Sequence, residues 1–113
     1  MQRGEIWVAN LNPNKGKEIG KARPVVILQA DELLESALST LVVVPLTTQY
    51  RPTFKTLRIE IAPRDRLLKT CYAMAEHPRT LDRRRLSDGP LALLTDSEMS
   101  ALEKSLKAVM GLL

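Results

Sequence analysis

The side chains of this chain best suited to chemistry stand close to the ends of apolar runs. Arg23 comes directly before the run 24–29, Thr47 comes shortly after the run 39–44, and Glu76 follows the run 71–75. An arginine stays protonated and can donate two parallel hydrogen bonds to phosphate oxygens, and a threonine hydroxyl can donate one more. A carboxylate beside them could accept a proton or orient an arginine. Because sites are usually built on loops at strand ends, these three residues are the candidates for chemistry on a phosphate group, although each also has an ordinary structural role at a strand end or turn.

Several other kinds of site are excluded by what the sequence lacks. The glycines form neither a P-loop nor a dinucleotide fingerprint, and no His-Glu-x-x-His motif occurs. Cys71 is the only cysteine and His77 the only histidine, which excludes a disulfide framework and a zinc site built from several Cys and His ligands within one subunit. We therefore expect no cofactor and no metal, and we interpret Cys71 as a buried small hydrophobe.

Short apolar and β-branched runs separated by turn residues predict a chain that is mainly strand. In residues 56–61 the alternation is strict, which predicts that Arg58 and Glu60 face water while the residues between them face the core. Pro45 is expected to interrupt the third strand, because proline cannot donate to a sheet ladder. Trp7, inside the first strand, is interpreted as a core anchor. The expected strands are residues 5–9, 24–29, 39–44, 56–61, 71–75 and 91–94.

The last part of the chain predicts one helix. Thr95 and Glu98 have the spacing of a capping box, in which each side chain satisfies a backbone N–H at the start of a helix. One apolar stripe follows at helical spacing, formed by Met99, Leu102, Leu106, Val109 and Leu113. Short strands followed by one terminal helix predict a mainly β fold, built as a small, strongly bent sheet or barrel.

Length and charge limit the classes of protein that this chain can represent. Its 113 residues, 44% of them hydrophobic, suit one domain spanning residues 1–113. No segment reaches the roughly 18 consecutive apolar residues of a membrane span, and no signal peptide is recognised, so we expect a soluble, cytoplasmic protein. The net charge is +4. It gathers in residues 15–23, with four basic and one acidic residue, and in residues 64–85, with seven basic and three acidic residues, which favours a polyanionic partner.

Three motifs in order resemble the MazF/PemK family of toxin ribonucleases. Residues 3–7 read RGEIW, and a Pro, a Gly, a Glu and an Arg-Pro-Val follow at matching intervals within residues 11–26. The resemblance continues in VPLTTQ at residues 44–49 and in EHPRTLD at residues 76–82, and the terminal helix falls where the family has one. It covers most of the chain.

This resemblance implies an SH3-like small barrel with a C-terminal helix, a homodimer, and a cognate antitoxin that silences the protein. It also implies sequence-selective, metal-independent cleavage of single-stranded RNA. In such relatives the Arg of the Arg-Pro motif and the first Thr of the Thr-Thr-Gln motif serve catalysis, which points to Arg23 and Thr47. The loop Glu and the acidic residue at the third motif, here Glu18 and Glu76, lie near the substrate in family members.

The physical chemistry of RNA agrees with these assignments. RNA carries its own nucleophile, the 2′-hydroxyl, so cleavage needs in-line positioning, proton transfer and positive charge on the phosphorane, and it leaves a 2′,3′-cyclic phosphate and a 5′-hydroxyl. Arg23 suits the charge role and Thr47 the hydrogen-bonding role, whereas Glu76 is either a base or an orienting group. The residues expected to bind RNA are Lys15, Lys17, Glu18, Lys21, Thr48, Gln49, His77 and Arg79.

The sequence departs from some relatives at Lys17, before the loop Glu, and at Met74, where they carry an arginine that donates a proton. A methionine cannot donate a proton, which places more of the chemistry on Arg23.

Two alternative functions stay open. A CcdB-like gyrase poison shares the fold but ends in a Trp-Gly-Ile tail, whereas residues 110–113 read MGLL. A catalytically silent homologue would bind RNA or antitoxin without cutting.

Overall fold

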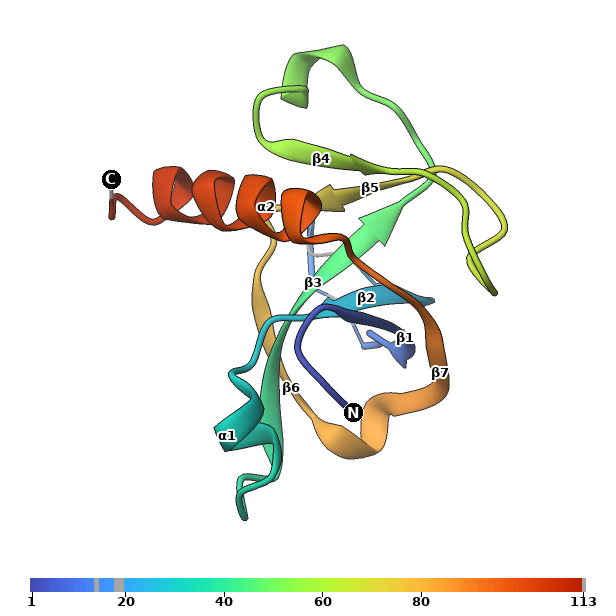
Figure 1. Ribbon diagram of the computed structural model, residues 1–113, viewed down its shortest axis with the longest axis vertical. Helices are drawn as coiled ribbons and strands as arrows, with labels where there is room; N and C mark the ends of the chain where they lie inside the picture. Colours follow the sequence, from blue (N-terminus) through green and yellow to red (C-terminus); the bar gives the residue numbers. More distant parts are fainter. Residues whose placement is uncertain (14, 18–19, 113) are drawn as a thin grey trace.

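The computed structural model describes residues 1–13, 15–17 and 20–112, and in this part of the chain seven strands form one antiparallel sheet followed by a helix (Figure 1). The strands are β1 (Glu5–Asn10), β2 (Ala22–Ile27), β3 (Thr40–Thr47), β4 (Arg58–Ile61), β5 (Cys71–Met74), β6 (Arg79–Asp82) and β7 (Leu86–Leu93). The helices are α1 (Asp31–Leu34) and α2 (Asp96–Val109), and short 3₁₀ turns cover Pro52–Phe54 and Arg83–Arg85.

The sheet is organised around β3, its longest central strand. The strand order is β4-β5-β3-β2-β1-β7, and β6 pairs with the first half of β3 while β5 pairs with its end. The mainly β fold with a C-terminal helix is therefore confirmed. Within the described residues this path is not closed, so the sheet is bent and open rather than a complete barrel.

The sequence predicted that Pro45 interrupts the third strand, and this prediction is wrong. Pro45 lies inside β3, opposite Val25 of β2. The carbonyl of Val42 accepts a hydrogen bond from Leu28, so the even-numbered residues of β3 direct their backbone groups toward β2 and Pro45 directs its nitrogen away from β2. On that side the pairing with β6 ends at Val43 and the pairing with β5 begins only at Leu46. The missing N–H of Pro45 therefore costs no ladder hydrogen bond.

The two faces of the bent sheet pack against two separate groups of buried side chains. On one face, Val44 and Leu46 of β3 pack with Leu102 and Leu106 of α2. On the other face, the alternate residue Val43 packs in a cluster that also contains Val25, Ile27, Leu34 and Leu81. Since side chains alternate along a strand, residues in step with Val25 and Val43 lie on the face turned away from α2.

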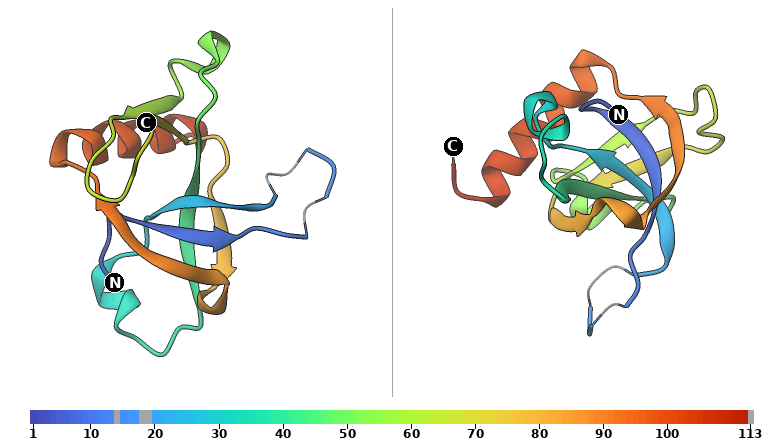
Figure 2. Two further views of the ribbon diagram at one scale, coloured as in Figure 1. Left: turned by 90° about the vertical axis from the view of Figure 1, so that its right-hand side faces the viewer. Right: turned by 90° about the horizontal axis from the view of Figure 1, so that it is seen from below.

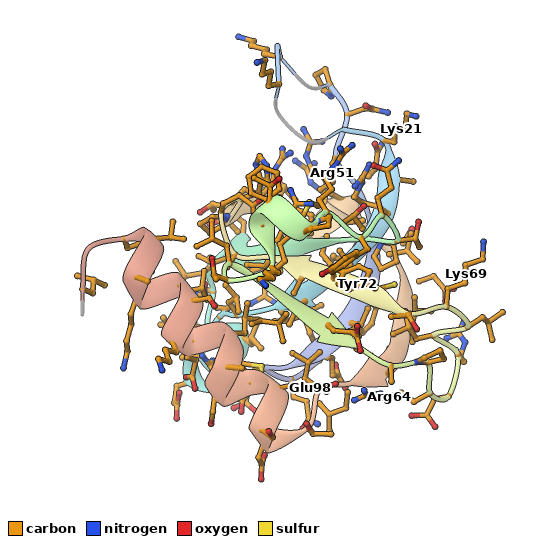
Figure 3. The ribbon with its side chains drawn as sticks, turned by 90° about the horizontal axis from the view of Figure 1, so that it is seen from above. Lys21, Arg51, Arg64, Lys69, Tyr72 and Glu98 are labelled. Carbon is orange, nitrogen blue, oxygen red and sulfur yellow. The ribbon has the colours of Figure 1, made fainter. Side chains whose placement is uncertain are left out.

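Helix α2 begins as predicted but contributes less of its stripe to the core. Thr95 and Glu98 form the capping box, and Glu98 also makes two hydrogen bonds of 2.6 Å to Arg64 (Figure 3). Leu102 and Leu106 are buried, whereas Val109 is 39% exposed. Leu113, the last residue of the predicted stripe, lies outside the described residues. No helix in the described part of the chain is long and apolar enough to cross a membrane.

The other differences from the predicted elements concern the strands after residue 75. Residues 79–82 of the third motif form β6, which was not among the predicted strands, and β7 starts at Leu86 rather than at residue 91. With four residues, β6 is too short for a recognisable alternation, and the first half of β7 reads LSDGP, which is rich in turn residues. At the other end of the chain, β2 starts at Ala22, so that Arg23 lies within the strand.

Trp7 generates a prediction about stability. Its indole packs against the buried cluster on the face of the sheet turned away from α2. A Cβ added at Gly89 of β7 would lie only 2.6 Å from the indole Cγ. Gly89→Ala is therefore expected to destabilise the fold by about 1–3 kcal/mol through overpacking, measured by urea unfolding. Ser87→Ala, an exposed change in the same strand, should stay within about 0.5 kcal/mol. Equal stabilities of the two variants would contradict this close packing.

Candidate functional site

A cavity of about 380 Å³ opens beside the end of β3. It is bordered by β2, by β3 and the loop that follows it, and by β4 and β5. The lining residues are Arg23, Pro24, Leu46, Thr47, Thr48, Gln49, Arg51, Arg58 and Met74. Four residues predicted from the sequence, Arg23, Thr47, Thr48 and Gln49, therefore meet at one place. We call this cavity the arginine pocket.

The strand register explains why these side chains converge. Val25 stands opposite Pro45, and two residues further along β2 and β3 are Arg23 and Thr47, which therefore share the face turned away from α2. On the other side of β3, Thr47 stands opposite Tyr72 of β5. Directly opposed residues of an antiparallel pair lie on one face, so the side chains of three neighbouring strands point the same way.

Arg23 is half-buried, and its guanidinium is incompletely satisfied. Its Nε is buried and has no hydrogen-bond partner within the residues that the structure describes. A buried donor without a partner costs about 1–3 kcal/mol, and native structures leave few of them. Arg23 also lines the arginine pocket, so an anionic ligand bound there would lie beside its guanidinium.

Thr47 faces the pocket with its hydroxyl already oriented. Its Oγ1 accepts a hydrogen bond of 3.2 Å from the backbone N–H of Gln49, which leaves the hydroxyl proton to be donated elsewhere. The Oε1 of Gln49 in turn accepts from Nη2 of Arg51 at 2.9 Å. This chain of contacts shapes the loop after β3 and brings a second arginine to the rim.

Arg58 is a pocket residue that the sequence prediction missed. It was expected to face water, but its side chain is only 10% exposed. Its Nε donates to Oε2 of Glu76 at 2.8 Å, Nη2 donates to the same oxygen, and the guanidinium carbon lies 4.5 Å from the ring centroid of Phe54. Arg58 stands directly opposite Met74. The alternating pattern correctly placed Arg58 on the face of the strand opposite to the apolar residues. It could not show that β5 lies beside this strand or that Phe54 packs against the guanidinium.

Glu76 does not line the arginine pocket, but its carboxylate accepts hydrogen bonds from Arg58, which does line it. Its side chain is 18% exposed, and its carboxylate is held by Arg58. Burial raises the pKa of this carboxyl, but the hydrogen bond from Arg58, a backbone hydrogen bond and the charges of Arg58 and His77 outweigh burial and lower the pKa below its ordinary value. Glu76 is therefore ionised at neutral pH. Its Oε1 is buried and has no hydrogen-bond partner within the described chain.

The pocket lining is strongly asymmetric in charge. Among the described residues it contains the guanidinium groups of Arg23, Arg51 and Arg58 and no carboxylate. Guanidinium groups match the geometry of phosphate oxygens and are less strongly hydrated than ammonium groups. In the part of the chain that the structure describes, no group of three or more His, Cys, Asp or Glu side chains is placed to hold a metal ion. The arrangement can bind a phosphate diester and stabilise additional negative charge on it.

The other predicted RNA-binding residues lie outside the pocket lining. Lys15, Lys17 and Lys21 are exposed in the segment between β1 and β2, which extends away from the sheet (Figure 2). Figure 3 shows Lys21 on the same side of the molecule as Arg51. Glu18, in the same segment, lies outside the described residues.

His77 and Arg79 follow β5 and are both half-buried. The backbone N–H of His77 donates to the carbonyl of Met74 at 2.9 Å and closes a turn. Arg79 starts β6, where it stands opposite Val43. Both residues are thus placed by the turn and by the strand that follow the pocket wall rather than by the pocket itself.

The chain matches a family model described as PemK-like, MazF-like toxin of type II toxin-antitoxin system, over residues 2–110. Its fold is similar to that of an endoribonuclease in complex with its cognate antitoxin from Mycobacterial species, with a TM-score of 0.79 and 24% identity over 100% of this chain and 97% of the other. It is also similar to MazF from Deinococcus radiodurans, with a TM-score of 0.82 and 20% identity over 98% and 96% of the two chains. A MazE-MazF structure from Deinococcus radiodurans matches with a TM-score of 0.77 and 18% identity over 100% and 97%.

The ion pair between Glu76 and Arg58 generates a prediction about acid sensitivity. Glu76→Gln should lower the free energy of unfolding by about 1–3 kcal/mol at pH 7, because it leaves the nearly buried Arg58 without its counter-charge. The ordinary pKa of the carboxyl is 4.5 and the folded pKa is lower, so the stabilisation is fully present above about pH 4.5. It is lost as the pH falls through the folded pKa.

Urea unfolding at several pH values measures this effect. The difference between the wild-type protein and Glu76→Gln should shrink below about pH 4.5. The control is Glu35→Gln, which changes an exposed carboxylate after α1 and should have little effect at any pH. A difference as large at pH 3 as at pH 7 would show that the ion pair is not its source.

Proposed function

The chain belongs to the family of PemK-like, MazF-like toxins of type II toxin–antitoxin systems, and from this membership we propose that it is a sequence-selective, metal-independent endoribonuclease that cleaves single-stranded RNA. The observation that carries the proposal is the arginine pocket, where Arg23, Thr47 and Arg58 meet and no carboxylate from the described residues joins the lining. We further propose that residues 1–113 form a single toxin domain.

The proposed reaction is transesterification within the RNA. The 2′-oxygen attacks the adjacent phosphorus, a P–O2′ bond forms and the P–O5′ bond breaks. One proton leaves the 2′-hydroxyl and one reaches the departing 5′-oxygen, so the products are a 2′,3′-cyclic phosphate and a 5′-hydroxyl. Negative charge increases on the non-bridging oxygens in the transition state, and catalysis requires donors already aimed at those oxygens.

Arg23 and Arg58 are proposed to bind the scissile phosphate from two sides. The position of Arg23 in the pocket lining supports this role, because a guanidinium matches the geometry of phosphate oxygens. Arg58 supplies a second guanidinium from β4, directly opposite Met74. The hydroxyl of Thr47, whose oxygen already accepts from Gln49, donates a third hydrogen bond to the same phosphate.

For Glu76 we propose a positioning role that acts through Arg58. The carboxylate accepts two hydrogen bonds from Arg58, and its pKa is lowered, so it is a weak proton acceptor at neutral pH. Its main effect is then to fix the direction of the Arg58 guanidinium. Of the two sequence-based options, a base or an orienting group, this proposal keeps the second and identifies Arg58 of β4 as the arginine that Glu76 orients.

The remaining predicted residues are proposed to guide the RNA to the pocket. Thr48 and Gln49 line it, His77 lies in the turn after β5, and Arg79 starts β6 next to β3. Lys15, Lys17 and Lys21 extend the positive charge along the segment after β1, where Glu18 also belongs, and exposed lysines favour contacts with the RNA backbone that weaken with salt.

We also propose that the protein inhibits growth as a homodimer and that a cognate antitoxin neutralises it. The similarity to an endoribonuclease in complex with its cognate antitoxin and to a MazE-MazF structure supports the antitoxin partner. The antitoxin segment that contacts the basic stretches is expected to be acidic, because complementary charge favours association.

Cleavage of a long defined single-stranded RNA in the presence of EDTA tests the catalytic proposal. Wild-type protein should cut at one recurring short site and leave the two end groups given above. Arg23→Ala should slow cleavage by about 10²–10³-fold, the usual cost of losing a transition-state donor, and Arg58→Ala should act similarly. Thr47→Ala should have a smaller effect, about tenfold, because a neutral hydrogen bond is weaker than a charged one.

Lys69→Ala is the matched control, because it removes one positive charge from an exposed loop distant from the pocket (Figure 3). It should cleave at nearly the wild-type rate. Circular dichroism checks that each variant is folded. An Arg23→Ala variant that is folded and cleaves as fast as Lys69→Ala would sink the role of Arg23.

A further inference from the structure

A second cavity of about 200 Å³ lies next to the arginine pocket. It is lined by Tyr50, Arg51, Lys55, Arg58, Glu60 and Tyr72, so that Arg51 and Arg58 form the wall between the two cavities. Figure 3 shows Tyr72 on β5 below Arg51. We call this second cavity the tyrosine pocket.

Two aromatic rings give the tyrosine pocket its character. The centroids of Tyr50 and Tyr72 are 5.5 Å apart and their planes are tilted by 48°. Tyr50 is 56% exposed, in the loop after β3. A large exposed ring beside a cavity offers a flat surface for stacking, and base–aromatic stacking contributes about 1–3 kcal/mol per base.

Strand register ties this surface to the proposed site of cleavage. Tyr72 stands opposite Thr47 on one side and opposite Glu60 on the other. These side chains lie on the face that also carries Arg23. A ligand that reaches Thr47 in the arginine pocket therefore lies one strand away from Tyr72.

The charges of the two cavities suit different parts of a nucleotide. In the part of the chain that the structure describes, the arginine pocket is lined by guanidinium groups without a carboxylate, whereas the tyrosine pocket contains the carboxylate of Glu60. A carboxylate repels phosphate but accepts hydrogen bonds from the amino and imino groups of bases. Burial, followed by the charge of Glu60, raises the pKa of Tyr72, so its hydroxyl is protonated at neutral pH and can also donate.

We propose that the tyrosine pocket binds one nucleobase of the RNA, stacked on Tyr50, next to the phosphate held in the arginine pocket. This inference rests on the proposed function, because it assigns part of the sequence selectivity of that reaction. Lys55 and Arg51 are the donors available at the rim, and Glu60 is the acceptor. The base in this position is therefore selected by stacking and by its hydrogen-bonding edge.

The test uses a single-stranded RNA in which every 2′-hydroxyl is replaced by fluorine, since such RNA has no nucleophile and cannot be cut. The probe is chosen from a random-sequence pool for binding to the wild-type protein. Each base of the probe is then removed in turn, leaving an abasic position, and the affinity is measured for wild type, Tyr50→Ala and Tyr50→Phe.

At one position, removal of the base should weaken binding to wild type by roughly 5- to 100-fold. The same removal should weaken binding to Tyr50→Ala much less, because the stacking surface is already absent. Tyr50→Phe keeps the ring and should behave like wild type. Leu68→Ala, which shortens an exposed side chain on another loop, is the matched control and should also behave like wild type.

Base-by-base profiles that are identical for wild type and Tyr50→Ala would overturn the proposed base-binding role. That outcome leaves the cleavage assay in EDTA unaffected, so the proposed ribonuclease activity would stand. Conversely, wild-type protein that binds the probe with the expected loss at one position but cuts no natural RNA would support the tyrosine pocket and contradict the proposed activity. A wild-type protein that selects no RNA from the pool but cuts natural RNA would overturn the tyrosine pocket alone, and one that neither selects nor cuts RNA would overturn both.

Discussion

The register of β3 between its two neighbours is the constraint on which the candidate site depends. Val25 opposite Pro45 on one side, and Thr47 opposite Tyr72 on the other, determine which side chains leave the face of the sheet turned away from α2. A slip of one residue would turn the side chain of Thr47 toward the apolar core under α2. The buried residues on both faces oppose such a slip. Val43 and Val44 pack in two different apolar clusters, and neither cluster tolerates a polar side chain. The core of this protein therefore positions its chemistry.

Concentrating positive charge on that face requires a compensating interaction behind it. Arg58 is nearly buried, and a buried charge is stable only when it is paired and hydrogen-bonded. Glu76 provides the counter-charge from beyond the pocket, and the ring of Phe54 lies against the guanidinium. Glu76 thus allows a third guanidinium to line the arginine pocket, while the carboxylate of Glu76 itself lies outside the lining. The same arrangement explains how β4 contributes an arginine opposite Met74, the position at which some relatives were expected to carry one.

The sequence was informative where the determinants are local. The capping box at Thr95 and the closeness of Arg23 and Thr47 to the ends of strands follow from adjacent residues, although the structure places both residues inside strands that were predicted to stop short of them. The pocket residues Arg58 and Tyr72 were not predicted, because their positions depend on the pairing of β4, β5 and β3, which is non-local. Pro45 misled the prediction for a similar reason: its tolerance in β3 depends on the change of partner from β6 to β5, which no local pattern reveals.

A crystal structure with a short RNA lacking the 2′-hydroxyl at the cleaved nucleotide tests the central claim most directly. If the arginine pocket binds the scissile phosphate, we expect one phosphate there. Its oxygens should lie about 2.7–3.2 Å from the guanidinium nitrogens of Arg23 and Arg58 and from the hydroxyl of Thr47. Arg58 should still be held by Glu76 in that complex. A phosphate bound elsewhere on the protein, with the arginine pocket unchanged, would contradict the role of this pocket in binding the scissile phosphate.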